Sequence, residues 1–386
     1  MLSKIMAAHI AIVGVGIGGL ALAHALGSSG FKVSLLEQAE SLSEIGEGLS
    51  LWENGLQALQ AIGLRELVEA VGQPWAEYDI HRPAKSKVTR NNQVLSIDGS
   101  TCPLMIKRGS LFGVLLDNLP QRVDIITAFK VIDISGHEIT AEDGRTLSAD
   151  IIIGADGAHS QVRKELTQES PRFCKQICFR AITTRHGKMP LKAAEVYEQN
   201  NHRFGYFQLL EDEIYWFDIV DSETPFAPFE DYQNDIKNLS PLIAEIVEDT
   251  KSETILCHPI EDMRPVTRAH DFIALIGDAA HPMQPSLGQG ACLALEDAIV
   301  LANCLKKHAD DTPKALRIYV SKRKKRWKLY YKVCQQLGTG TLDKGIAGRK
   351  MAIARMVHTP QWALSLFGRR IFKFKQGREY LTSDAG

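Results

Sequence analysis

The stretch HIAIVGVGIGGLALAHALGSSGFKVSLLE, residues 9–37, decides the fold. His9–Val13 is a short, partly β-branched apolar run, which is typical of a buried parallel strand. A glycine-rich turn follows, and Leu20–Leu26 then reads as a helix that ends at Gly27-Ser28-Ser29-Gly30. Phe31–Leu36 is a second apolar strand. The stretch therefore predicts a βαβ unit, whose crossover helix makes the two strands parallel.

Gly14, Gly16 and Gly19 form the pattern G-x-G-x-x-G between the predicted strand and helix. Gly14 permits the tight turn, Gly16 lets the backbone approach a pyrophosphate, and Gly19 allows close packing of helix on strand. The helix N-terminus offers amides and a positive dipole end to phosphates. Glu37, at the end of the second strand, can accept hydrogen bonds from a ribose hydroxyl. These residues predict a dinucleotide site and leave FAD and NAD as alternatives.

The composition is that of an ordinary globular protein with more than one sub-domain: 386 residues, 45% apolar and 24% charged. A net charge of −1 argues against a nucleic-acid partner. The seven cysteines are scattered without a CxxC pair, so we expect free thiols in a reducing cytosol and no metal site. The uncharged run 5–31 resembles a signal peptide or a membrane span, but its glycines favour strand, turn and helix. We therefore expect a cytoplasmic protein.

Later segments predict an antiparallel sheet inserted into the nucleotide-binding unit. Between Trp75 and Asp98, alternating stretches are broken at Asn91-Asn92, which indicates a hairpin turn. Strands are also expected at 182–185, 204–210 and 214–220, the last two joined as a hairpin by the polar turn 211–213. Buried parallel strands are expected at 150–153 and 272–276, and helices at 291–305 and from 314 onward.

Two further motifs follow predicted strands: Gly154-Ala155-Asp156-Gly157-Ala158-His159-Ser160-Gln161-Val162-Arg163, and Gly277-Asp278-Ala279-Ala280-His281-Pro282, which continues through Pro285 and Gly288-Gln289-Gly290. With the glycine pattern, and in this order, they resemble the three signatures of the class A flavoprotein aromatic hydroxylases. That family includes para-hydroxybenzoate, salicylate and urate hydroxylases and zeaxanthin epoxidase, and the likeness is best to the salicylate, urate and zeaxanthin epoxidase branch. Residues 50–55 and 107–111 also resemble the family, and the likeness spans residues 8 to about 335.

The resemblance implies an α/β fold in which a Rossmann-like FAD-binding domain is interrupted by an antiparallel β-sheet substrate domain and followed by a C-terminal helical region. We expect the FAD-binding domain in three parts, at residues 1–74, 99–178 and 259–335. The substrate sheet is expected at 75–98 and 179–258, and the helical region at 336–386.

The resemblance also implies which residues bind FAD, besides Gly14, Gly16, Gly19 and Glu37. Asp156 and Gly157, supported by Arg163, are expected on the pyrophosphate side. Asp278 is expected to hold ribityl hydroxyls, with Arg108 reaching the FAD as well; a structural aspartate and a surface salt bridge are the alternatives for these two. Pro285 stiffens the turn that follows. The amides of Gly288, Gln289, Gly290 and Ala291, at a helix N-terminus, are expected at the pyrimidine edge of the flavin.

By resemblance, NADH or NADPH reduces the FAD, O2 forms a flavin C4a-hydroperoxide, and one oxygen atom is transferred to a small aromatic or heteroaromatic substrate. Arg203 and Tyr215, on the two arms of the predicted hairpin, are the catalytic candidates on the substrate side. Arg203 is expected to pair with a carboxylate or enolate, and Tyr215 to donate to a ring hydroxyl, unless both are ordinary sheet-surface residues. His202 and Trp216 have the opposite strand parity and are expected to face away.

Two positions depart from the family's pattern. Glu37 is followed by Gln38, where an arginine is frequent, and Glu47 stands where the family has a small apolar residue near the flavin. His281 is expected in the loop beside the flavin, either as an acid/base group or as a packed loop residue. Only one dinucleotide fingerprint is present, because Gly338-Thr339-Gly340 follows no predicted strand.

Other functions stay open at this point. One alternative is a flavin-dependent reductase or dehydrogenase without oxygen insertion, a second is a drug-inactivating monooxygenase of the tetracycline type, and a third is a regulatory nucleotide-binding protein. The basic run 322–328 is expected to be a solvated helix face. As a minor hypothesis, the basic tail with Trp362, Phe367, Phe372 and Phe374 contacts a membrane or a partner.

Overall fold

The computed structural model describes residues 8–42, 47–75, 77–81, 87–91, 103–184, 193–197, 202–210, 212–338, 363, 366, 368 and 371–374. For 77–81, 87–91 and 197 it describes the backbone only.

A five-stranded parallel sheet forms the base of the first unit, in the order β18-β12-β1-β2-β8. Its strands are β1 (His9–Val13), β2 (Lys32–Leu36), β8 (Val123–Ile126), β12 (Ile151–Gly154) and β18 (Ile273–Leu275). Four of them occupy the apolar runs that predicted buried strands, because a parallel sheet is covered on both faces. The prediction of a Rossmann-like parallel sheet is confirmed.

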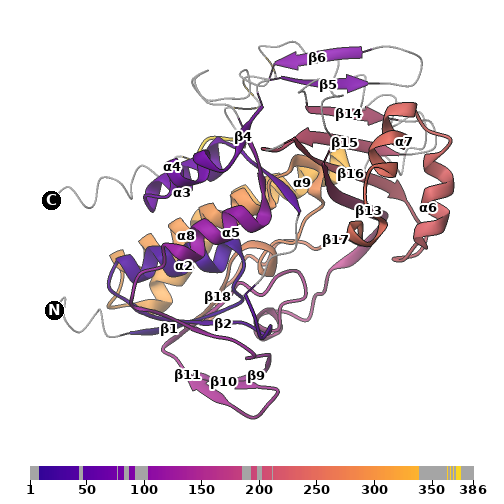
Figure 1. Cartoon of the computed structure of the whole chain (residues 1–386). Coiled ribbons are helices and arrows are strands. Elements are labelled where there is room, and N and C mark those ends of the chain that lie inside the picture. Colours follow the sequence, from indigo (N-terminus) through magenta and orange to yellow (C-terminus); the bar gives the residue numbers. More distant parts are fainter. Residues whose placement is uncertain are drawn as a thin grey trace.

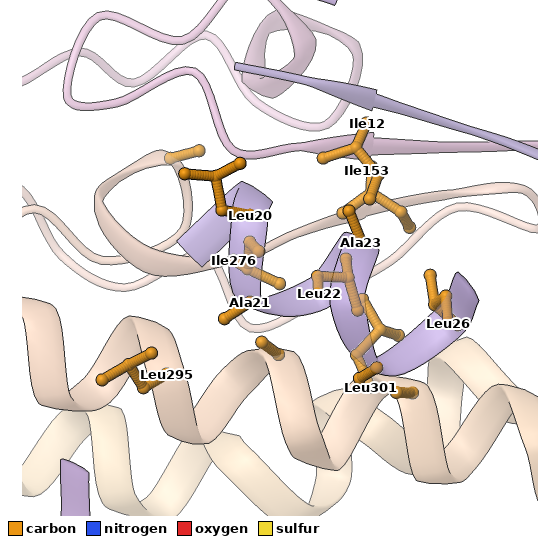
Figure 2. Close-up of a cluster of buried hydrophobic side chains, with 14 of the residues drawn as sticks. Ile12, Leu20, Ala21, Leu22, Ala23, Leu26, Ile153, Ile276, Leu295 and Leu301 are labelled. Atoms are coloured by element: carbon orange, nitrogen blue, oxygen red, sulfur yellow. The ribbon is translucent and has the colours of Figure 1, made fainter. Parts of the chain in front are cut away.

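Helices cover one face of this sheet, and a small antiparallel sheet lies on the other side (Figure 1). The helices are α2 (Ile17–Ser28), α5 (Arg108–Asp117) and α8 (Gly290–Lys307), with α3 (Glu53–Ala61) and α4 (Arg65–Ala70) nearby. The small sheet consists of β9 (Val131–Ser135), β10 (Glu138–Ala141) and β11 (Thr146–Ser148). Helix α2 is buried on nearly all sides because it lies between the sheet and α8. Figure 2 shows its side chains packed between Ile12 and Ile153 of the strands and Leu295 and Leu301 of α8.

The second unit is a seven-stranded sheet, in the order β17-β13-β16-β15-β14-β5-β6. Its strands are β5 (Glu77–His81), β6 (Lys87–Asn91), β13 (Arg172–Thr184), β14 (Ala193–Tyr197), β15 (Arg203–Gln208), β16 (Glu213–Asp221) and β17 (Leu256–Asp262). The predicted hairpin of residues 204–220 is confirmed as β15 and β16, which pair antiparallel. Of the turn predicted at Asn91-Asn92, Asn91 lies in β6, where it pairs with Glu77 of β5, and Asn92 lies outside the described residues.

The two faces of this sheet have different neighbours. Helices α6 (Phe229–Ile236) and α7 (Pro241–Glu248) cover the outer face, where Phe179, Phe204 and Trp216 are buried (Figure 1). His202 and Trp216 lie on this side, as their strand parity predicted. The inner face carries Arg203, Phe207 and Tyr215. It packs toward a three-stranded sheet of the first unit, formed by β3 (Gly48–Leu51), β4 (Gln73–Pro74) and β7 (Leu104–Lys107).

Helix α9 (Thr312–Leu337) confirms the prediction of a solvated basic face only in part, since Lys322, Lys325 and Lys328 are exposed. Arg323 and Trp327 are buried, and only some of the lysines between them face solvent. In the tail, Phe372 and Phe374 are buried as well, and Phe372 stacks on Trp52 with ring centroids 4.2 Å apart. These two aromatic residues therefore belong to the core, whereas Trp362 and Phe367 lie outside the described residues. Within the described part of the chain, no helix is long and apolar enough to cross a membrane.

Candidate functional site

The glycine turn after β1 has little room for side chains on one side and open space on the other. Gly14 has φ +103°, and a β-carbon there would lie 2.5 Å from the carbonyl oxygen of Ala155. A β-carbon on Gly19 would overlap the carbonyl oxygen of Gly14. A β-carbon on Gly16, in contrast, meets no atom within 4 Å. The turn is therefore packed tightly at Gly14 and Gly19 and open at Gly16, in front of the N-terminus of α2.

Glu37 closes this turn from the end of β2. One of its carboxylate oxygens accepts a hydrogen bond from the amide of Val15 (3.1 Å), and the other accepts one from the amide of Ala39 (3.0 Å). The side chain is half-buried, so the carboxylate holds the glycine turn while part of it stays accessible. A carboxylate has about four lone-pair positions, and two remain for a hydroxyl ligand.

Asp156 uses its carboxylate within its own loop. It accepts hydrogen bonds from the Ser160 hydroxyl and from the amides of Gln161 (2.7 Å) and Val162 (3.3 Å), at the start of the 3₁₀ helix η2 (Val162–Glu165). These bonds shape the loop that contains Gly157, whose φ of +76° suits glycine. Asp156 can therefore act on a cofactor through loop shape, with the backbone of Gly157 as the part that faces open space.

Arg163 joins the second and third motifs. Its guanidinium is buried and donates to the carbonyl oxygens of Ala279 (3.2 Å) and Ala158. Ala279 belongs to the 3₁₀ helix η4 (Gly277–Ala279), directly after β18. Motifs that are far apart in the sequence thus meet at the carboxyl edge of the parallel sheet, where ligands bind in α/β folds.

Asp278 is the accessible carboxylate at this edge. Its side chain is exposed, yet desolvation by the surrounding protein raises the pKa of its carboxyl, against the opposing effects of His281, Arg108 and Arg163. The carboxylate of Asp278 is therefore accessible although protein atoms surround it. Arg108, at the start of α5, is close enough to lower the pKa of this carboxyl, so the fold brings Arg108 and Asp278 together from distant segments.

The loop before α8 presents backbone groups toward the same region. Pro285 begins the 3₁₀ helix η5 (Pro285–Leu287), which ends at Gly288 in a left-handed conformation. Gln289 caps α8 without a side-chain hydrogen bond to the helix amides, and a β-carbon on Gly290 would meet nothing within 4 Å. The side chain of Gln289 accepts from Asn54 (2.9 Å), while its buried Nε2 has no hydrogen-bond partner among the described residues. The N-terminus of α8, including Ala291, therefore has donors to offer a ligand.

His281 is held inside a buried charged network that the sequence did not reveal. Its Nε2 lies 2.6 Å from Asp297 of α8, and neither side chain is exposed to solvent. Asp297 also accepts from Arg323 (2.6 Å) and Trp327 (2.9 Å) of α9. Neighbouring Glu296 accepts from Arg323 (2.6 Å) and Asn54 (2.7 Å). Of the two expectations for His281, the packed loop residue is the one that this geometry favours.

Arg203 and Tyr215 lie on the inner face of the seven-stranded sheet, each against the first unit. Arg203 binds Glu195 of β14 through two hydrogen bonds (2.9 and 3.3 Å), and its Nη2 lies 3.5 Å from the carbonyl oxygen of Ser286 in η5. The ring of Tyr215 lies against Gly48, where a β-carbon would overlap it. Burial raises the pKa of the Tyr215 hydroxyl above its usual range. The two residues therefore line the seam between this sheet and the first unit, Arg203 at the loop before α8 and Tyr215 at β3.

Glu47 also reaches this seam. Its carboxylate pairs with Arg180 of β13 (2.9 Å), and its carbonyl oxygen accepts from the amide of Arg108 (2.6 Å). The charge that departs from the family's pattern is thus neutralised by the substrate sheet.

Three comparisons identify the chain. A family model described as an FAD binding domain matches residues 7–332. Aurachin C monooxygenase/isomerase of Stigmatella aurantiaca is 30% identical, over 82% of this chain and 85% of that protein. 6-Hydroxynicotinate 3-monooxygenase of Pseudomonas fluorescens is 29% identical, over 82% of this chain and 88% of that protein.

The chain belongs to the class A FAD-dependent aromatic hydroxylases. A solved structure with the same fold is that of HpxO of Klebsiella pneumoniae complexed with FAD and uric acid, with a TM-score of 0.77, 21% identity and coverage of 97% of this chain and 95% of that one. The residues described above fit an FAD. A flavin dinucleotide needs open backbone at a helix N-terminus and accessible carboxylates for its hydroxyls, and this class A hydroxylase has open backbone at Gly16 and Gly290 and an exposed carboxylate at Asp278. Among the described residues, no cluster of His, Cys, Asp and Glu could hold a metal ion.

Proposed function

We propose that this chain is an NAD(P)H-dependent monooxygenase that hydroxylates a small aromatic or heteroaromatic substrate with O2. The observation that carries the proposal is the contact of Arg203 with Ser286, because it joins the substrate sheet to the loop that resembles the family's flavin motif. Two related monooxygenases are named for aurachin C and for 6-hydroxynicotinate, which supports a heteroaromatic ring as substrate.

Four groups of residues would hold the FAD. Gly14, Gly16 and Gly19, with Asp156 and Gly157, would receive the pyrophosphate, and Glu37 a ribose. Asp278 and Arg108 would bind the ribityl side, and the loop from Pro285 to Ala291 would meet the pyrimidine edge of the flavin. When bound, FAD supplies hydride acceptance from NADH or NADPH and activation of O2, which side chains alone do not provide.

The chain itself orients the substrate and excludes water. Tyr215 keeps its proton at neutral pH because burial raises its pKa, so its hydroxyl can donate a hydrogen bond to an oxygen or nitrogen of the substrate. Trp75, Phe207 and Phe217 pack beside Tyr215 and make the seam apolar. A ring bound there would lie away from bulk water, where a hydrogen bond from Tyr215 is stronger than in solution.

The test is NAD(P)H oxidation by the purified holoenzyme, with the flavin spectrum recorded before and after adding a panel of salicylates, hydroxybenzoates, hydroxypyridines, quinolones, urate and tetracyclines. The proposal predicts that one compound accelerates oxidation sharply and gains one oxygen atom from ¹⁸O2. Turnover without oxygen in the product would favour a flavin-dependent reductase. A protein that cannot be loaded with FAD would overturn the proposal.

The proposal also includes a reducing, cytoplasmic location. No disulfide joins the six cysteines among the described residues, which supports it.

A further inference from the structure

The inner face of the substrate sheet carries few positive charges among its described residues, and carboxylates stand beside them. Besides Arg172, which pairs with Asp262 at the start of β13 (2.9 Å), the arginines among the described residues of this face are Arg180 of β13 and Arg203 of β15, and Lys107 of β7 approaches it from the first unit. Each of the three cations lies within ion-pair distance of one glutamate. The pairs are Arg180–Glu47 (2.9 Å), Arg203–Glu195 (2.9 Å) and Lys107–Glu213 (2.5 Å).

These pairs are partly buried, so solvent screens them weakly. The side chains of Arg203 and Glu195 are 20% and 12% exposed, and those of Arg180 and Glu47 are 27% and 16% exposed. The Arg203–Glu195 pair is a forked contact in which Nε and Nη2 reach the two carboxylate oxygens. That geometry occupies one of the two edges of the guanidinium with which arginine binds a carboxylate ligand.

His258 adds no positive charge to this region. Burial, followed by the field of Arg180, lowers the pKa of His258, which contacts Arg180 through Nδ1 (3.3 Å). The imidazole is therefore neutral at pH 7, because its pKa lies below the ordinary value of 6.5.

We infer that this enzyme's substrate is an uncharged aromatic or heteroaromatic ring with an O–H or N–H donor, and that Glu195 and Glu47 exclude aromatic carboxylates. The inference deepens the proposed function and rests on it. A carboxylate brought to Arg203 would also face Glu195, and two like charges close together in a partly desolvated site repel each other. A neutral ring avoids this repulsion, its donor can bind a glutamate oxygen, and its faces meet the apolar surface of Phe207, Tyr215 and Phe217.

This revises the role expected for Arg203. The sequence predicts that it pairs with a carboxylate or enolate of the substrate, and in this structure it binds Glu195. The pair fixes Arg203 between β14 and the loop before α8, so Arg203 is a positioning residue whose charge is already compensated.

The experiment measures ligand binding to the oxidised holoenzyme, through the change in the flavin spectrum, without NAD(P)H. The ligands are matched acids and amides of similar shape: salicylate and salicylamide, 4-hydroxybenzoate and 4-hydroxybenzamide, 6-hydroxynicotinate and 6-hydroxynicotinamide. The proteins are the wild type, Glu195→Gln, Glu47→Gln and the double variant. Glu223→Gln is the control, because it removes the same charge from an exposed pair with Lys175.

In the wild type we expect the amide to bind at least tenfold more tightly than the acid within each pair that binds. Glu195→Gln and the double variant should gain at least tenfold in affinity for the acids and change little for the amides, and the control should match the wild type. Acids that bind the wild type as tightly as the amides, or glutamine variants with unchanged affinity for acids, would overturn the inference. The inference would also be overturned if the wild type and the double variant bound neither the acids nor the amides. The proposed function fails on a different readout, the oxygen atom in the product, so the two outcomes stay distinguishable.

Discussion

Gly16 and Gly19 belong to the same turn but have different roles, because Gly16 is expected to admit the cofactor and Gly19 allows the turn to pack. Gly16 has φ −89° and open space in front of it, so alanine fits there in the apoprotein. We expect Gly16→Ala to change the free energy of unfolding of the apoprotein by less than about 1 kcal/mol. It should lower FAD affinity at least tenfold, because the methyl group stands where the pyrophosphate would approach.

Gly19→Ala is the matched comparison. Its methyl group would overlap the carbonyl oxygen of Gly14, and overpacking of this kind costs about 1–3 kcal/mol. Chemical denaturation of both apoproteins and titration with FAD, followed by flavin fluorescence, give the two quantities. Normal FAD affinity in Gly16→Ala would place the pyrophosphate elsewhere.

The ionised carboxylate of Asp278 is expected to bind FAD, but it destabilises the folded apoprotein. Because its pKa is raised in the folded protein, ionising it there costs free energy at every pH above the ordinary value of about 3.9, and the cost disappears as the pH falls. We expect apo Asp278→Asn to be at least as stable as the wild-type apoprotein at pH 7, with the difference shrinking toward pH 4. FAD affinity should fall tenfold or more, since a hydrogen bond to a charged group contributes about 1.5–3 kcal/mol.

The control for Asp278 is Asp271→Asn, which removes an exposed carboxylate paired with Arg317 at the surface. It should leave FAD affinity unchanged. Thermal unfolding at pH 7 and pH 4, with and without FAD, measures both effects. Full flavin occupancy in Asp278→Asn would contradict its assignment to the cofactor site.

At the scale of elements, buried charges join α8 to α9. Burial alone would raise the pKa of Glu296 and of Asp297, but Arg326 and Arg323 outweigh it for Glu296, and Arg323 and His281 for Asp297. Both carboxyls therefore have lowered pKa values in the folded protein. Their contribution to stability is present above the ordinary carboxyl pKa of about 4 and is lost as the pH falls through the lower, folded values.

Arg323→Met should remove most of this contribution, because buried Asp297 loses its main compensating charge, while Glu296 keeps only Arg326 of its two arginines. The expected loss is about 3–5 kcal/mol in the free energy of unfolding at pH 7, and it should become smaller toward pH 3 as the carboxylates protonate. Urea denaturation across this pH range is the measurement. Lys325→Met, an exposed position on the same helix, should change stability by less than about 0.5 kcal/mol. A similar loss in both variants would show that the network contributes nothing specific.

The sequence predicts the elements that are buried on both faces. It does not predict strand pairs and ion pairs between residues that are far apart in the chain. β1 and β12 were predictable because apolar runs must be covered on both sides. The strands of the three-stranded sheet β3-β7-β4 were not predicted, because β3 and β4 have no such run and that of β7 is only three residues long, Leu104–Ile106. Arg323 was expected on a solvated face because its partners lie on another helix, and helical spacing alone does not report them. The pairs of Arg203 with Glu195 and of Arg180 with Glu47 were missed for the same reason.

At the scale of the whole molecule, buried Asp262 ties the two sheet units together. It accepts hydrogen bonds from Arg172 of β13 (2.9 Å), from Gln284 in the loop before α8 (2.7 Å) and from Gln335 of α9 (3.3 Å). One carboxylate thus binds the substrate sheet, the third motif and the last long helix. The chain also passes between the units several times, so separating them would break contacts at each crossing (Figure 1). We therefore expect both units to unfold in one transition.

Four buried native thiols allow this to be tested by chemical labelling, without introducing new residues. Cys174 and Cys178 lie in β13, and Cys292 and Cys334 lie in α8 and α9. Burial raises the pKa of each to about 12, so very little thiolate is present at pH 8, and a thiol reagent reacts slowly until the fold opens. With labelling resolved by peptide mass spectrometry across a urea series, all four should become reactive at the same denaturant concentration.

In Asp262→Ala, Cys174 and Cys178 should become reactive at a lower urea concentration than Cys292 and Cys334, because the carboxylate that joins the two units is lost. If the wild type already shows that separation, the two sheets unfold independently and Asp262 is not what joins them.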